Sequence, residues 1–153
     1  HQSISMHALG TIETANRYDS EHRATGFVTH EVDKVTLDQT LLGPTSGERV
    51  GFINVDAEGH EFAVLRGGEG LIAKHRPVLL IELEYRHGAQ VLEIFEWLQA
   101  RGFVAQALTH RHTFARIGPE ELRILQNERR LTRRLAGSRN SGYLNNIFFI
   151  PEP

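Results

Sequence analysis

Two carboxylates, Asp56 and Glu58, directly follow the β-rich run of residues 50–55. A carboxylate at the tip of a strand can accept a hydrogen bond from an amine or hydroxyl ligand, or it can act as a base toward an acceptor hydroxyl. The imidazole of His60 is a third candidate base. A structural alternative is that Asp56 or Glu58 caps the following helix by accepting backbone N–H groups. One residue can cap while its neighbour faces a ligand.

Glu82 and Glu84 lie at the end of a second apolar run, residues 78–83. Side chains alternate along a strand, so both glutamates are expected on the same face of the sheet. A buried pair of carboxylates is costly without partners, so at least one of them should reach solvent or a cleft. The pair could therefore face a ligand cleft or serve structure alone, and the spacing of Glu82 and Glu84 leaves both interpretations open.

Two further patterns suggest ligands, but each has a simpler structural interpretation. Asp56, Glu58, His60 and Glu61 are of the residue types that bind divalent metals, but their side chains need not converge, and we predict no metal. Residues 68–73 fit the pattern G-x-G-x-x-A, which binds a dinucleotide when it joins a strand to a helix. Here the pattern follows a predicted helix, so it indicates a helix break.

The elements that must position these residues form an α/β pattern, read from hydrophobic periodicity and from glycine and proline breakers. Strands are predicted at 30–36, 50–55, 78–83, 103–108, 112–117 and 143–150. Helical segments are predicted at 37–42, after His60 in two pieces separated by the glycines of 67–70, at 90–100 and at about 119–135. This order is typical of parallel strands joined by crossover helices, and such sheets bind ligands beyond the carboxyl ends of their strands.

Two of these helices differ in how clearly a buried face can be identified. In the helix at 90–100, Val91, Ile94, Phe95 and Leu98 form one apolar stripe, and Trp97 beside it should serve packing. The helix at 119–135 could bury Ile124, Leu131 and Leu135 and expose its arginines. An RNA-binding surface made by Arg129, Arg130, Arg133 and Arg134 is the alternative for that helix, and we favour the scaffold interpretation.

Composition limits the class of protein. The chain has 153 residues, of which 40% are hydrophobic and 24% charged, so we expect a single globular domain in which residues 1–29 are an irregular lead-in. Its net charge of -2 gives no general attraction to nucleic acid or to an anionic membrane, and we predict neither partner. No targeting peptide is visible, so a cytoplasmic location is expected. The chain does not begin with methionine, which suggests processing, trimming or a fragment.

Four sequence elements in one order resemble the FkbM family of methyltransferases. Residues 51–68, GFINVDAEGHEFAVLRGG, are similar to that family's strand, D-x-E-G-x-E turn and L-x-G helix. Residues 75–82 resemble its R-P-x-x-x-x-E strand, residues 35–38 its T-L-D element, and residues 145–150 its closing strand. The resemblance spans roughly residues 30 to 150, and its specificity comes from the order of the four elements.

The resemblance implies the carboxyl-terminal part of a class I, Rossmann-like methyltransferase fold, with a mostly parallel sheet and an antiparallel last strand. Residues 50–55, 78–83 and 103–108 would be the fourth, fifth and sixth strands of that fold, and 145–150 the seventh. The first three strands and the glycine-rich cofactor turn are not found. The fourth strand would then expose an apolar edge, which predicts self-association into a homo-oligomer.

The resemblance also implies a chemistry, which is methyl transfer from S-adenosylmethionine, expected at an oxygen of a small natural product or a glycan. Asp38 and Asp56 would bind the cofactor. The base would be Asp56, Glu58 or His60. Glu58 and Glu82 would border the acceptor, and Glu84 would bind it together with Glu82. The alternative is a noncatalytic, truncated methyltransferase-like interaction module, and the sequence encoded upstream would distinguish the two.

Overall fold

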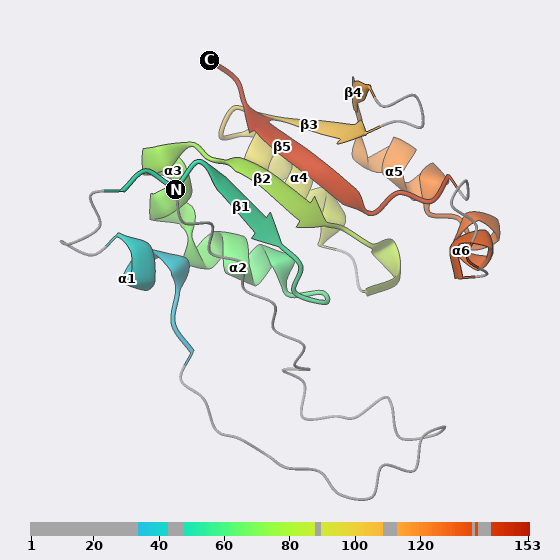
Figure 1. Cartoon of the computed structure of the whole chain (residues 1–153), viewed down its shortest axis with the longest axis horizontal. Coiled ribbons are helices and arrows are strands. Elements are labelled where there is room, and N and C mark those ends of the chain that lie inside the picture. The colour runs from blue at the N-terminus through green and yellow to red at the C-terminus, as the bar shows by residue number, and fades with distance from the viewer. Residues whose placement is uncertain (1–33, 43–47, 88–89, 109–112, 136, 138–141) are drawn as a thin grey trace, which may run out of the picture. The chain divides into compact units, whose positions relative to one another are not determined.

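The β-rich run after Arg49 forms the first strand of a mixed sheet in a computed structural model that describes residues 34–42, 48–87, 90–108, 113–135, 137 and 142–153. Within these residues the strands are β1 (Phe52–Val55), β2 (Val78–Glu82), β3 (Phe103–Leu108), β4 (Phe114–Arg116) and β5 (Asn146–Pro151). They lie side by side in the order β1-β2-β5-β3-β4 (Figure 1). The elements described below belong to residues 36–153, which form one compact unit.

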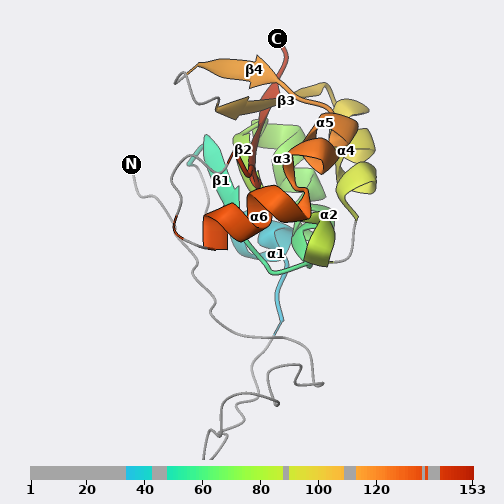
Figure 2. The same ribbon diagram turned by 90° about the vertical axis from the view of Figure 1, so that its right-hand side faces the viewer.

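Helices precede β1 and lie between most of the strands that follow it. They are α1 (Leu37–Leu41), α2 (Glu61–Gly67), α3 (Glu69–His75), α4 (Val91–Gln99), α5 (Pro119–Leu125) and α6 (Glu128–Leu135), with the short 3-10 helix η1 (Tyr85–His87) after β2. In two views at right angles, α3, α4 and α5 lie on the same side of the strands (Figures 1 and 2). The described ranges contain no helix of the length and apolar character needed to cross a bilayer.

The expectation of a mostly parallel sheet is wrong, because the sheet is mixed. Only β1 and β2 pair in parallel among the described strands, whereas β5 is antiparallel to both β2 and β3, and β4 is antiparallel to β3. The strands β2 and β3 run in the same direction, and β5 lies between them and runs in the opposite direction. Both pairs that β5 makes are therefore antiparallel. The short link between β3 and β4 also permits antiparallel pairing only. The predicted antiparallel last strand is confirmed.

The core lies between one face of the sheet and helices α2 to α5. Cross-strand neighbours such as Val55 and Ile81 are buried together, and the stripe predicted on α4 is buried as well. Trp97 serves packing as expected, since its ring lies edge-on to Phe62 at 6.1 Å and under the Arg101 guanidinium at 3.8 Å. The burial of this apolar surface is the main force that holds the strand tips in place.

Gly67, Gly68 and Gly70 divide the helical segment after His60 into α2 and α3, as predicted. The structure adds a second reason for glycine, which is the close approach of α1. A Cβ on Gly68 would lie 2.9 Å from Leu37 Cδ1, and a Cβ on Gly70 would lie 2.9 Å from Asp38 Oδ2. The glycines therefore make room for α1 as well as interrupting the helix.

Two element predictions are wrong within the described residues. Residues 34–36 are not a strand, and the rest of the strand predicted at 30–36 lies outside the described range. The helix predicted at 119–135 is two helices, because the chain turns at Gln126. As a result Ile124 and Leu135 are 65% and 75% exposed instead of forming a buried stripe, and Leu122 is buried in their place.

Candidate functional site

The turn that follows β1 is held by the side chain of Glu61. Its Oε1 atom accepts hydrogen bonds from the backbone N–H groups of Ala57, at 3.2 Å, and Gly59, at 3.0 Å. Glu58 and Gly59 have φ angles of 47° and 92°, so the backbone turns sharply through the left-handed region, which is unfavourable for Glu58. Asp56 lies before this turn, directly at the carboxyl end of β1.

The capping role considered for Asp56 and Glu58 is not found. The residue before α2 is His60, whose side chain makes no capping hydrogen bond. The carboxylate that binds backbone N–H groups here belongs to Glu61, which is buried inside the first turn of α2. The N-cap position predicted for Asp56 or Glu58 is thus occupied by His60.

The end of β2 brings Glu82 beside the Asp56 carboxylate, because β1 and β2 are adjacent parallel strands with Val55 opposite Ile81. The pKa of Glu82 is raised from 4.5 to about 7, first by burial and then by a hydrogen bond to Asp56 and by the negative charges of Asp56, Glu84 and Glu58. A neighbouring negative charge and burial both disfavour the ionised form of a carboxyl group, so Glu82 keeps its proton to higher pH than an ordinary glutamate. Asp56 and Glu82 are therefore called the Asp56–Glu82 pair.

Glu84 is more deeply placed than Glu82, with a side chain only 3% exposed. One of its oxygens, Oε2, forms an ion pair with Arg86, and the other, Oε1, accepts a hydrogen bond from Asn145 Nδ2 at 2.9 Å. Burial and the nearby charge of Glu84 together raise the pKa of Tyr143. The buried charge of Glu84 is thereby compensated, and its two oxygens are directed at protein groups.

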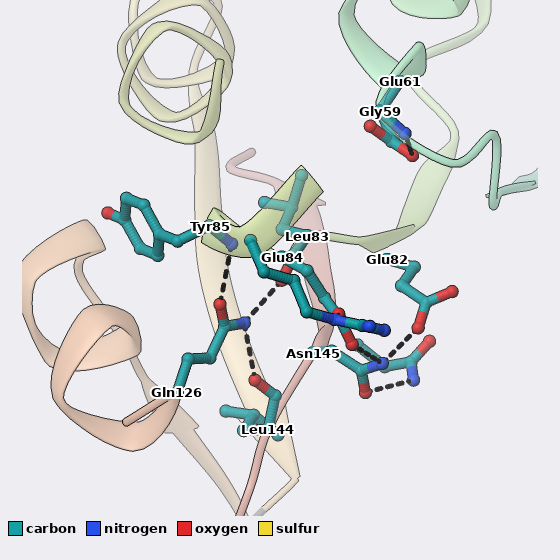
Figure 3. Close-up of polar contacts among 11 residues, drawn as sticks. Gly59, Glu61, Glu82, Leu83, Glu84, Tyr85, Gln126, Leu144 and Asn145 are labelled. Carbon is teal, nitrogen blue, oxygen red and sulfur yellow. Dashed lines mark hydrogen bonds and ion pairs between the residues drawn. The ribbon is translucent and has the colours of Figure 1, made fainter. Parts of the chain in front are cut away.

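Asn145 also donates a hydrogen bond from Nδ2 to Glu82 Oε1, so one amide group bridges the two glutamates (Figure 3). The same residue accepts a hydrogen bond at its backbone oxygen from Leu83 N, at 2.7 Å. Figure 3 shows Asn145 below the tip of β2, with Glu82 and Glu84 directed toward it. The prediction that the two glutamates share one face agrees with this arrangement, and Glu82 is the one that remains partly exposed.

Gln126 binds the backbone of the residues that follow β2 and of the residue Leu144, which precedes Asn145. Its Nε2 atom donates to the backbone oxygens of Leu83, at 2.5 Å, and Leu144, at 2.8 Å, and its Oε1 atom accepts from Tyr85 N at 2.9 Å (Figure 3). These are backbone groups beyond the point where β2 and β5 stop pairing. The turn between α5 and α6 therefore supplies a side-chain amide that satisfies the backbone where two strands diverge.

Asp38 makes a different set of contacts. Its Oδ2 and Oδ1 atoms accept hydrogen bonds from the backbone N–H groups of Gly70, at 2.9 Å, and Leu71, at 2.8 Å. These groups lie in the first turn of α3, so Asp38 caps α3 from a separate helix. A role for Asp38 in cofactor binding stays a prediction, and the contacts found are structural.

The structure brings together Asp56, Glu58, Glu82 and Glu84 of the predicted site residues. His60 stands at the end of the same turn and is half-buried. Across the described residues, no group of three or more histidine, cysteine or acidic side chains has the geometry of a metal site. The catalytic and ligand-binding roles assigned from the sequence stay predictions.

Sequence reasoning missed Asn145 and Gln126. Asn145 was considered only as part of the closing strand, although two consecutive asparagines at the start of an apolar strand indicate amide donors at a strand end. No comparable signal exists for Gln126, because a glutamine within a helical pattern is ordinary. Its function depends on residues that lie 41 and 18 positions away in the sequence.

Comparison with known proteins gives one result. The sequence matches the family model of the methyltransferase FkbM domain over residues 3–105, which include all four carboxylates of the site. The match starts ahead of the resemblance found by motifs and ends before β5. No curated protein and no solved structure matches the sequence.

Proposed function

Because the chain belongs to the FkbM methyltransferase domain family, we propose that it is an S-adenosylmethionine-dependent enzyme that methylates a hydroxyl oxygen of a small natural product or a glycan. The observation that supports this most is the placement of Glu82, with its raised pKa, beside Asp56 at the ends of two parallel strands. Ligands of open α/β sheets bind at this end of the strands.

The pair provides a base for the acceptor. A general base works best when its pKa lies near the pH of the reaction, and the pKa of Glu82 is about 7. In the proposed reaction the hydroxyl proton of the acceptor passes to the Asp56–Glu82 pair. Glu82 is partly exposed and borders the acceptor, whereas Glu84, which is buried, supports it from behind.

The charges at the site suit the proposed cofactor. S-adenosylmethionine supplies a methyl group on a positively charged sulfonium and also carries an ammonium group. The carboxylates of Asp56 and Glu58 complement these positive charges, and Asp56 would accept a hydrogen bond from the amino group. Methyl transfer to oxygen then depends mainly on alignment of the acceptor by the protein.

Calorimetric titration with S-adenosylmethionine tests the proposal. It should be performed on this chain and, if the gene encodes residues before His1, on the longer protein as well. We expect Asp56→Asn to weaken binding by about tenfold, the usual effect of losing a charge-assisted hydrogen bond. Glu93→Gln is the matched control, because it removes one exposed negative charge from α4.

Transfer itself is measured with the cofactor carrying a radiolabelled methyl group and a panel of sugars and hydroxylated small molecules. The expected result is an oxygen-methylated product whose rate rises with pH through about 7, as Glu82 loses its proton. The absence of cofactor binding by both forms of the protein would refute the proposed function and leave an interaction module as the explanation.

A further inference from the structure

Asn145 lies directly before β5, and its side chain forms hydrogen bonds with two glutamates of the site. It is 2% exposed, and its side-chain nitrogen donates one hydrogen bond to Glu82 and one to Glu84. An amide nitrogen carries two hydrogens, so these two bonds use its full donor capacity. The residue thus links a partly exposed carboxylate to a buried one.

The orientation of the Asn145 amide is fixed by its other bonds. Its Oδ1 atom accepts from Asn146 Nδ2 at 3.0 Å, and its backbone oxygen accepts from Leu83 N at 2.7 Å. Reversal of the amide would direct Oδ1 at two carboxylates and leave the Asn146 donor facing an amino group. The surrounding bonds therefore keep both N–H groups directed at the glutamates.

We propose that Asn145 is a positioning residue, which holds Glu82 in hydrogen-bond reach of Asp56 by tying it to the anchored carboxylate of Glu84. This inference rests on the proposed function, because the Asp56–Glu82 pair is the base of the proposed reaction. Glu84 can act as the anchor since it is itself fixed by Arg86. A residue just before the last strand thereby positions a carboxyl group at the end of β2.

The charges that face Glu82 explain why it needs a tether. Asp56 and Glu58 lie on the turn after β1, and Glu84 follows on the same segment as Glu82, so all three repel its ionised form. The guanidinium of Arg86 is engaged with Glu84, and Tyr143 lies beside them. Without Asn145, ionised Glu82 would turn away from Asp56 into solvent.

Nuclear magnetic resonance of the chain with carboxyl-labelled glutamate tests this inference. Glu82→Gln identifies the Glu82 signal. In the wild-type chain the signal should titrate near pH 7, as the raised pKa of Glu82 requires. In Asn145→Ala and in Asn145→Leu, which keeps the buried volume, the midpoint should fall by at least about one pH unit toward the ordinary value, because the carboxyl leaves Asp56.

Gln126→Ala controls for general loosening of the segment, because it removes hydrogen bonds to the same segment but touches only its backbone. This variant should leave the Glu82 midpoint within about 0.3 pH unit of wild type. A shift in Gln126→Ala as large as that in Asn145→Ala would overturn the inference.

A rise of the Glu82 midpoint in the Asn145 variants would also contradict the inference, since Asn145 would then only stabilise the ionised carboxylate of Glu82. An unchanged midpoint would contradict it too, because Asn145 would then have no effect on Glu82. If the variants do not fold, the wild-type chain still decides the question. Its Asn145 side-chain N–H signals must shift with a midpoint near pH 7, and their failure to do so sinks the inference. If the wild-type protein does not bind S-adenosylmethionine, the proposed function is refuted. The titration of Glu82 in the Asn145 variants still decides whether Asn145 positions that carboxyl group.

Discussion

At the scale of single residues, Asp56 and Glu82 depend on each other although 26 positions separate them in the sequence. Each would be an ordinary surface carboxylate alone. Strand pairing brings them together, and the raised pKa of Glu82 follows from burial, from Asp56 and from the charges of two further acids. The chemical character of the site is therefore a property of the pair and its surroundings.

The raised pKa of Glu82 predicts how stability depends on pH. The folded chain keeps a proton between about pH 4.5 and 7 that the unfolded chain releases, so the free energy of unfolding contributed by this group falls as pH rises through that window. Glu82→Gln should lose this dependence and be more stable than wild type at about pH 8. The gain should be on the order of 1 kcal/mol, since solvent screens this partly exposed pair.

Urea denaturation at about pH 5 and pH 8 measures the effect as a difference between Glu82→Gln and wild type, which cancels the contribution of the histidines. Glu93→Gln removes an exposed negative charge from α4, and its free energy of unfolding should depend on pH as that of wild type does. If the free energy of unfolding changes equally between about pH 5 and pH 8 in Glu82→Gln and in wild type, Glu82 does not keep its proton to a pH of about 7.

The sequence predicts the carboxylates of the site because strand alternation and the position of acids at strand ends are local patterns. Asn145 could not be predicted in the same way, since its partners lie 63 and 61 positions earlier. No local pattern specifies which strand will be inserted beside Glu82. The role of a side-chain donor becomes visible only when that neighbour is known.

At the scale of elements, the docking of α1 against α3 is the contact most open to test. Asp38 binds the N–H groups of Gly70 and Leu71, and Gly70 leaves no room for a Cβ beside Asp38. Asp38→Ala should lower the free energy of unfolding by roughly 1 to 2 kcal/mol through loss of the cap. Gly70→Ala should also destabilise, although alanine favours a helix by about 1 kcal/mol over glycine.

The double variant tests whether the two residues act through one contact. Once Asp38 is alanine, the oxygen that a Cβ on Gly70 would meet at 2.9 Å is gone, so adding Gly70→Ala should cost less than it does in the wild-type chain. Denaturation curves of the four proteins give this coupling. Additive losses would indicate that the clash is with Leu42, whose Cδ1 lies 3.0 Å from the same position.

Element boundaries were predicted well where periodicity and breakers agree, as in β3 and α4. The division of residues 119–135 into two helices was missed for a physical reason. Helix propensity favours continuation through Gln126, but its side chain satisfies the backbone groups of Leu83, Leu144 and Tyr85. A tertiary contact outweighs the local preference there.

At the scale of the whole molecule, β1 is an edge strand within the described sheet, and its Phe52 is 54% exposed. An edge with unpaired backbone groups and an exposed aromatic residue favours pairing with another chain. We therefore expect self-association that increases with protein concentration in light scattering. Phe52→Lys should reduce it, because a charge on an edge strand opposes such pairing.

Leu92→Lys is the matched control for this prediction. Leu92 is 50% exposed, like Phe52, but it lies on α4 and has no sheet edge beside it. It should leave the scattering unchanged. A wild-type chain that remains monomeric at high concentration, or an equal effect of both lysine variants, would contradict association through β1.

The α/β class and the antiparallel last strand could be predicted, and the sheet as a whole could not. Periodicity identifies strands but does not specify their order, so it cannot show that β5 lies between β2 and β3. Because β5 lies between them, β2 and β3 do not form a parallel pair, and each pairs with β5 in antiparallel orientation. The order of strands is set by burial across the whole sheet rather than by any local pattern.

The same placement limits the order in which this chain can mature on the ribosome. The strands β1 and β2 form one piece and the hairpin of β3 and β4 another, and within the described sheet the two are joined edge to edge only through β5. A nascent chain lacking residues 146–151 therefore exposes the inner edges of both pieces. Unpaired strand edges invite pairing with other chains, so this protein is open to aggregation until residues 146–151 have joined the sheet.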